Sequence, residues 1–214
     1  MNTPLRTLYF TLFIRPVVNL FLGINIRRRE NLLLTGPAIL VANHNSHLDT
    51  MVLMSLIPLK QLPVTRPVAA ADYFLKNKLL TWFSKEIIGI IPLHRKAHST
   101  EGQHPLAKCF QALEENNILI IFPEGSRGQP EKLSHFKNGV AHLAERYPNI
   151  PIIPIFMHGL GKSLPKGEAL LVPFICDIFV GEPFYWETNR QAFRQTLDDA
   201  MKQLASEGDF PAWE

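Results

Sequence analysis

The sequence predicts an α/β fold in which a largely parallel central sheet is flanked by helices. Short runs built almost entirely of apolar residues alternate along the chain with longer segments of helical periodicity. Fully apolar strands are typical of parallel sheets that are covered on both faces. At 214 residues, 46% hydrophobic and 19% charged, the chain is long enough for one well-filled core and carries no linker or repeat. We therefore expect one domain, residues 31–214, preceded by a helical segment, residues 1–30.

The N-terminal segment is predicted to associate with a membrane. Residues 8–24 are nearly all apolar, but seventeen residues is the lower limit for a bilayer span, and Arg15 near the middle makes spanning costly. Polar residues recur every four positions, at Thr7, Thr11, Arg15 and Asn19. We expect a helix, or two helices broken at Pro16, that lies on the cytoplasmic face of a membrane as a peripheral or monotopic anchor. The alternative is a buried core helix.

Basic residues are concentrated in the same segment. Only Glu30 opposes five arginines there, which are Arg6, Arg15, Arg27, Arg28 and Arg29. The last three could meet anionic headgroups. No small-residue cleavage site follows the apolar run, which argues against a signal peptide.

Strands and helices alternate through the rest of the chain. The apolar runs predict strands over 38–42, 67–71, 118–122, 152–157 and 174–180. Helical patterns are predicted over 49–57, 72–85, 105–115, 134–147 and 189–206. Pro58 ends the first of these helices, and Asp72 is the expected N-cap of the second. Functional groups in such folds gather at the carboxyl ends of the strands.

The first candidate site follows the strand 38–42. His44 stands just after the strand, and Asp49 follows five residues later. On a regular helix these two residues would lie about 140° apart. They can face each other only if His44 lies in the turn before a helix and Asp49 in its first turn, which is where a base and its orienting carboxylate are commonly mounted. The alternative is an ordinary loop with polar capping residues.

A second candidate site follows the strand 118–122, in the run Pro123-Glu124-Gly125-Ser126-Arg127-Gly128. The two glycines let the backbone bend sharply and approach a ligand. The planar guanidinium group of Arg127 is suited to bind phosphate or carboxylate. Glu124 could bind that guanidinium group or a substrate hydroxyl. The alternative is a tight turn with an exposed ion pair. Arg95, after the apolar segment 89–93, is by itself better explained as a solvated loop residue.

Taken together, these segments resemble the four sequence blocks of the glycerolipid acyltransferase family, above all 1-acylglycerol-3-phosphate (lysophosphatidate) acyltransferases. The resemblance covers roughly residues 30–183. It rests on the H-x4-D motif at His44 and Asp49, on G-x5-R ending at Arg95, on F-P-E-G-S-R at 122–127, and on the P-x-x-P strand at 151–154. The second block is looser, because Pro92-Leu93-His94 stands where the family often has an aromatic or aliphatic pair and an aspartate.

The resemblance implies direct transfer of a fatty acyl group from acyl-CoA or acyl-carrier protein to the free hydroxyl of a lysophospholipid, most simply 1-acylglycerol-3-phosphate. His44 would be the general base and Asp49 its orienting carboxylate. Substrate-binding residues would be Arg95, Glu124, Gly125, Ser126 and Arg127. Lys137 is a further candidate for the phosphate, and backbone N–H groups after His44 are candidates for holding the oxyanion. No cofactor, metal or acyl-enzyme is needed, because the thioester is a co-substrate.

Other functions stay open on the sequence alone. The histidine pairs His44/His47 and His94/His98, together with Asp49, could bind zinc in a hydrolase, although no spacing repeats a known ligand motif. A non-catalytic lipid-binding module on the membrane surface would explain the N-terminus but not the His44–Asp49 pair. Within the acyltransferases, the acceptor could be another lysolipid or an amino-acid lipid. A net charge of +3 is too mild to suggest nucleic acid.

The two cysteines give no disulfide framework. Cys109 and Cys176 lie in apolar stretches and are expected to be small core residues. A reducing compartment is the simplest setting for them.

Overall fold

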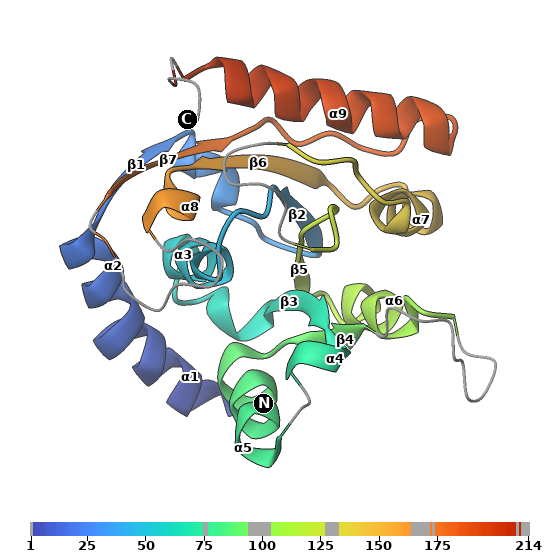
Figure 1. Cartoon of the computed structure of the whole chain (residues 1–214). Helices are drawn as coiled ribbons and strands as arrows, with labels where there is room; N and C mark the ends of the chain where they lie inside the picture. Colours follow the sequence, from blue (N-terminus) through green and yellow to red (C-terminus); the bar gives the residue numbers. More distant parts are fainter. Residues whose placement is uncertain are drawn as a thin grey trace.

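The computed structural model describes residues 2–74, 77–93, 104–126, 133–163, 172, 174–208 and 210. These residues form a seven-stranded sheet with the order β1-β7-β6-β2-β5-β3-β4, covered by helices on both faces (Figure 1). The strands are β1 Leu22–Arg27, β2 Ala38–Ala42, β3 Thr65–Ala70, β4 Ile91–Leu93, β5 Ile118–Ile121, β6 Ile152–His158 and β7 Phe174–Val180.

The helices alternate with these strands. The α-helices are α1 Thr3–Tyr9, α2 Arg15–Phe21, α3 Leu48–Leu56, α4 Ala71–Phe74, α5 Lys78–Phe83, α6 Ala107–Glu114, α7 Gly139–Arg146, α8 Leu160–Ser163 and α9 Arg190–Ser206. Two π-helical segments, η1 Phe10–Ile14 and η4 Ser84–Ile88, continue α1 and α5, and two short 3-10 helices are η2 Arg29–Leu32 and η3 Leu62–Val64.

The predicted α/β class and the largely parallel sheet are confirmed. Strands β6, β2, β5, β3 and β4 run parallel to their neighbours in that order. At one edge the direction reverses, since β7 is antiparallel to β6 and β1 is parallel to β7. The carboxyl ends of the five parallel strands therefore lie along one border of the sheet.

Two apolar layers cover the faces of the sheet. Leu40 and Ala42 of β2 pack in the core that holds α3 and the N-terminal helices. Ile39 and Val41 point the other way, into the core under α6, α7 and α9. The predicted apolar face of α9 is buried there, through Phe193, Leu197, Met201 and Leu204. The layers are visible in Figure 1, where α9 and α7 lie across the sheet from α2 and α3.

Two predicted helices differ from the structure, one by being divided and one by being shorter. The segment 72–85 contains α4 and α5 with residues 75–76 outside the described part, and Asp72 lies inside α4 instead of capping it. The segment 134–147 becomes helical only at Gly139. The residues before it bind to the turn after β5, where the Lys137 amide donates to the Pro123 carbonyl at 2.9 Å. That tertiary bond replaces the first turn of the predicted helix.

The N-terminal helix also ends earlier than predicted. The helical run reaches only Phe21, and the next residues form β1, in which Ile24 and Ile26 pair with Cys176 and Ile178 of β7. Before Pro16 the backbone takes the wider π-helical turn Phe10–Ile14, because proline lacks the N–H that an α-helix would need there. Within the described residues, no helix is long and apolar enough to cross a bilayer.

Most N-terminal arginines contact protein. Arg6 is fully buried and donates from Nη2 to the carbonyls of Thr65 and Ile88 at 2.6 and 3.0 Å. Arg15 donates to the Ile57 carbonyl at the end of α3. Arg27 lies over the Phe179 ring. The first helices and the domain therefore share one core.

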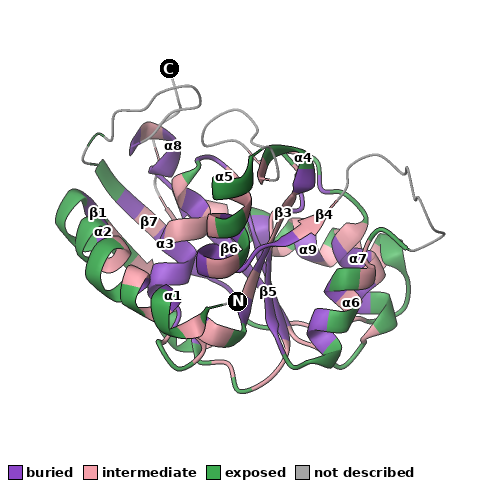
Figure 2. Ribbon diagram, turned by 90° about the horizontal axis from the view of Figure 1, so that it is seen from below, coloured by how far each residue is buried: buried purple, intermediate pink, exposed green. Residues whose placement is uncertain are grey.

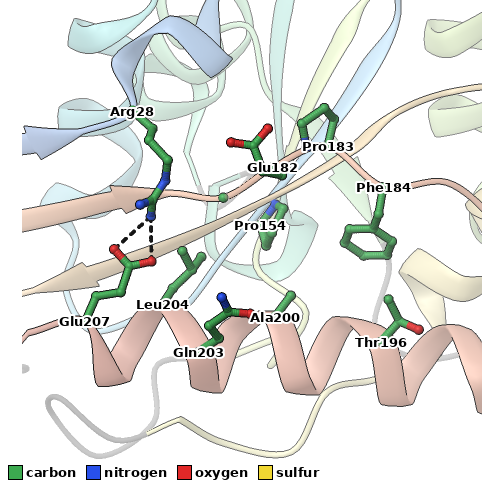
Figure 3. Close-up of a pocket in the computed structure, with 11 residues that line it drawn as sticks. Arg28, Pro154, Glu182, Pro183, Phe184, Thr196, Ala200, Gln203, Leu204 and Glu207 are labelled. Carbon is green, nitrogen blue, oxygen red and sulfur yellow. Dashed lines mark hydrogen bonds and ion pairs between the residues drawn. The ribbon is translucent and has the colours of Figure 1, made fainter.

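The next arginine, Arg28, forms a bidentate pair with Glu207 at 2.7 and 3.0 Å. Figure 3 shows this pair at the end of a pocket between α9 and the β6–β7 region, with a volume of about 310 Å³. None of the predicted site residues lines this pocket.

Candidate active site

The candidate site lies where β2 and β5 end. These two strands are parallel neighbours, with Val41 opposite Ile121. His44 follows β2 by two residues, and Phe122 to Gly125 form the turn that follows β5. Parallel pairing therefore brings the H-x4-D segment and the P-E-G turn, which are far apart in the sequence, to the same border of the sheet.

His44 and Asp49 are in direct contact. The His44 Nδ1 atom lies 2.8 Å from Asp49 Oδ2. His44 is in the turn before α3 and Asp49 is in the first turn of that helix, which is the geometry that their spacing required. Asp49 is fully buried, and the His44 side chain is 21% exposed. An imidazole at the surface is thus joined to a carboxylate that water cannot reach.

Asp49 is held by backbone donors as well. Its Oδ2 atom accepts hydrogen bonds from the amides of Asn45 at 2.7 Å and Ser46 at 2.9 Å. These amides were candidates for holding an oxyanion, and the structure gives them to the carboxylate instead. The Leu48 amide donates to Ser46 Oγ at 3.3 Å. The carboxylate is the better acceptor for these donors because it carries a full charge close to the start of a helix.

The contact with Asp49 decides which nitrogen of His44 is free. An ionised carboxylate accepts, so the ring proton is assigned to Nδ1 and the lone pair to Nε2. Such an imidazole can take a proton at Nε2 from a hydroxyl, and the carboxylate then stabilises the imidazolium. The pair is therefore suited to general-base chemistry.

Two buried asparagines fix the backbone on either side of His44. The Asn43 side chain pairs with Met157 of β6 twice, donating to its carbonyl at 2.8 Å and accepting from its amide at 2.7 Å. Asn45 donates to the same carbonyl at 2.9 Å. Sequence reasoning missed this role. The signal was present, because two amide side chains flank the histidine directly after a fully apolar strand.

The turn after β5 supports His44 from the other side. The Phe122 ring stacks on the imidazole, with centroids 4.3 Å apart and planes 21° from parallel. Glu124 Oε1 accepts a hydrogen bond from the His44 amide at 3.1 Å. Burial raises the pKa of the Glu124 carboxyl, and hydrogen bonds from the His44 amide and the Ser134 side chain offset part of that rise. The sequence interpretation gave Glu124 to an arginine or a substrate, whereas here it holds the backbone of the histidine.

Lys137 extends across Gly125. That glycine has φ +72°, and a Cβ built on it would lie 2.5 Å from Lys137 Nζ and 2.9 Å from Cε. Glycine is therefore favoured by the left-handed backbone, and it also lets the Lys137 side chain lie close against the turn. The exposed ammonium group stands over the P-E-G turn, next to the residue that contacts His44. The site thus has a cation within its described part.

The other predicted site residues divide into two groups. Ser126 is exposed at the end of the described turn. Arg95, Arg127, His94 and His98 lie outside the described residues, so their predicted roles remain predictions. Across the ranges that the structure does describe, no three His, Cys, Asp or Glu side chains come together as a metal site.

Comparisons with known proteins agree on one family. Residues 23–158 match the family model described as Acyltransferase. The chain is 30% identical over 149 residues to 1-acyl-sn-glycerol-3-phosphate acyltransferase LPAT1, chloroplastic, of Arabidopsis thaliana, covering 69% of this chain and 39% of that protein. It is 30% identical over 152 residues to the alpha form of 1-acyl-sn-glycerol-3-phosphate acyltransferase of Mus musculus, covering 70% of this chain and 50% of that protein. The chain thus spans half or less of the length of these two relatives.

The fold has a counterpart among solved structures. The crystal structure of the 1-acyl-sn-glycerophosphate acyltransferase PlsC from Thermotoga maritima superposes with a TM-score of 0.76. The two chains are 19% identical, and the match covers 96% of this chain and 81% of the other. At that identity the likeness supports the fold alone.

Proposed function

Because the chain belongs to the acyltransferase family, we propose that it moves a fatty acyl group from a thioester donor to the free hydroxyl of a lysophospholipid. The most suitable acceptor is 1-acylglycerol-3-phosphate, which would give phosphatidate. The observation that carries the proposal is the His44–Asp49 pair, in which a partly exposed imidazole is bonded to a buried carboxylate. The names of the two relatives described above favour the same acceptor.

The proposed reaction proceeds without a covalent enzyme intermediate. His44 Nε2 takes the proton of the acceptor hydroxyl while its oxygen attacks the thioester carbonyl carbon. A carbon–oxygen bond forms and the carbon–sulfur bond breaks. The imidazolium, stabilised by Asp49, returns its proton to the leaving thiolate. General-base help of this kind contributes about 10²–10⁴ in rate.

The phosphate of the acceptor needs cations beside the base. Lys137, which lies over the P-E-G turn, is the described residue best placed for this role. Arg127 follows the same turn directly in the sequence, and Arg95 follows β4, a strand of the same parallel group. We assign these three side chains to the phosphate, with Glu124, Gly125 and Ser126 shaping the turn that presents them.

The N-terminal helices are proposed to bring the enzyme to its lipid substrate. Their outer side carries exposed apolar side chains, which are Leu5, Leu8, Leu12, Phe13, Val17, Leu20 and Phe21. An apolar helical face of this kind can lie in the interface of a membrane without spanning it. We propose a peripheral or monotopic enzyme on the cytoplasmic face, with acyl-CoA or acyl-carrier protein as donor.

The test is acyl transfer by purified protein against a panel of lysolipids with acyl-CoA and acyl-carrier-protein donors. We expect turnover of 1-acylglycerol-3-phosphate, and a fall of about 10²–10⁴ in kcat for His44→Ala with an unchanged melting temperature. The matched control is His104→Ala, an exposed histidine outside the site, which should keep full activity.

Other outcomes would contradict the proposal. Lipid binding without thioester consumption would indicate a non-catalytic module. Loss of activity on chelation would favour the metal-dependent hydrolase. An acyl adduct on Cys109 or a serine, seen by intact-mass spectrometry, would contradict direct transfer.

A further inference from the structure

Helix α5 exposes two large apolar side chains that the proposed chemistry does not use. Leu79 is 77% exposed and Trp82 is 48% exposed. The continuation of this helix, η4, buries the apolar residues Ile87 and Ile88. Helix α5 itself buries no residue completely, and its Leu80, Thr81 and Phe83 are only partly buried. The unit is therefore anchored in the core through η4, and Leu79 and Trp82 remain on its outer side.

The inner side of the α5–η4 unit is attached to α1. The Asn2 amide donates to the Glu86 carbonyl at 3.3 Å, and Arg6 donates to the Ile88 carbonyl at 3.0 Å. The rings of Tyr9 and Phe83 meet edge to face, with centroids 5.4 Å apart. Figure 1 places α5 beside α1, and in Figure 2 both helices carry exposed residues. The α5–η4 unit is therefore packed directly against α1.

The chemistry of this outer surface fits a negatively charged lipid bilayer. Lys78 and Lys85 flank Leu79 and Trp82 and are both exposed. The helices α1 to α2 contain no acidic residue. Tryptophan prefers the membrane interface because its ring is apolar and its N–H needs a polar partner, and lysines beside it attract anionic headgroups.

We propose that α5 is a second membrane-contacting element, and that Leu79 and Trp82 enter the same anionic bilayer as the outer side of α1 and α2. The inference rests on the proposed function, because the proposed acceptor is a lipid that would lie in the membrane that α5 contacts. Helix α4, just before α5, contributes Tyr73, whose ring stacks on His47 with centroids 5.7 Å apart. His47 belongs to the same turn as His44. The helix that precedes α5 in the sequence therefore contacts the turn that carries the candidate base.

Tryptophan fluorescence provides the direct test, because the chain has three tryptophans. One variant, Trp186→Phe with Trp213→Phe, keeps Trp82. The control, Trp82→Phe with Trp213→Phe, keeps Trp186, which packs on Phe193 of α9 across the sheet. Each is mixed with phosphatidylglycerol–phosphatidylcholine vesicles that contain lipids brominated in the acyl chains. We expect strong quenching of Trp82 and little of Trp186, and equal quenching of both would overturn the proposal.

Vesicle sedimentation separates this contact from the N-terminal anchor. Leu79→Glu should weaken binding to the same vesicles about tenfold, and Leu20→Glu should do so independently. Tyr185→Glu, at an exposed aromatic residue before α9, is the matched control and should bind normally. Weaker binding for Leu20→Glu with normal binding for Leu79→Glu would overturn the α5 contact and leave the anchor intact.

Two further measurements separate the remaining explanations. Loss of self-association in Leu79→Glu, with unchanged vesicle binding, would show that α5 contacts a second copy of the chain and would overturn the membrane assignment. Turnover of a short-chain acceptor below its micelle concentration should stay within about twofold of wild type in Leu79→Glu, because chemistry then needs no bilayer. A wild-type protein that binds vesicles through Trp82 and yet has no turnover would contradict the proposed function only.

Discussion

At the scale of single residues, the position of His44 is set from three directions. Asp49 bonds the Nδ1 atom, Phe122 stacks on the ring, and the Asn43 side chain bonds the preceding backbone to β6. In addition, Glu124 Oε1 accepts a hydrogen bond from the His44 amide. A base that is held in this way loses little conformational entropy on reaching its reactive geometry.

Glu124 makes the stability of the site depend on pH. Burial raises the pKa of its carboxyl above the ordinary value of 4.5. The folded protein then binds this proton more tightly than the unfolded chain, so the group favours folding most at pH values below 4.5 and loses that contribution as the pH rises through the folded-state pKa. Glu124→Gln should therefore gain free energy of unfolding relative to wild type as the pH is raised from below 4.5 to neutrality.

Urea denaturation of both proteins across that range measures this difference. Glu187→Gln, at an exposed glutamate before α9, is the matched control against which the difference for Glu124→Gln is measured. A flat difference for Glu124→Gln would show that the hydrogen bonds from His44 and Ser134 fully offset burial, which would contradict a raised pKa.

At the scale of elements, Arg6 is the main polar attachment of α1. Its Nη2 atom bonds the last carbonyl of η4 and the first carbonyl of β3. Burial, and secondarily the neighbouring Arg66, lowers the pKa of Arg6 to about 9, so the group is still charged at neutral pH. A charged donor inside the core is costly unless its bonds are made, and α1 must therefore dock in one register.

Arg6→Ala should lower the free energy of unfolding by about 2–4 kcal/mol, since it removes charge-assisted hydrogen bonds and leaves a cavity. Chemical denaturation monitored by circular dichroism gives the value. Arg29→Ala, at an exposed arginine of η2, should change it by less than about 0.5 kcal/mol. Similar effects of the two substitutions would mean that α1 contributes little to the core.

At the scale of the whole molecule, the two ends of the chain are joined at one edge of the sheet. Strand β1 pairs with β7 along its whole length, and Arg28 pairs with Glu207 after α9. Asn31 donates to the Gly181 carbonyl at 3.0 Å, so the two borders of the acyltransferase resemblance are in contact. The edge is closed by residues that the sequence analysis placed in a separate segment.

Deleting residues 1–30 should therefore prevent cooperative folding. The deletion removes β1 and the buried side chains of Arg6, Phe10, Val18 and Leu22, which exposes the edge of β7 and one face of the core. We expect aggregation in size-exclusion chromatography and no cooperative thermal transition. A folded, monomeric protein of residues 31–214 would instead support the predicted division at residue 30.

Local pattern was enough for the elements whose structure depends on neighbours in the sequence. The apolar runs of β2 and β7 and the four-residue periodicity of α9 predicted their bounds almost to the residue, because burial on a strand or helix repeats with a short period. The spacing of His44 and Asp49 likewise allowed one geometry for contact, and the structure has it.

What only the tertiary structure decided involves partners far apart in the chain. The sequence could not show that Arg6 is buried, that 22–27 is a strand, or that Asn43 bonds Met157, 114 positions away. An arginine on an apolar helix and an asparagine after a strand have several stable environments when considered alone. Their environment is selected when the layers pack, because a buried polar group is tolerated only where a distant partner meets it.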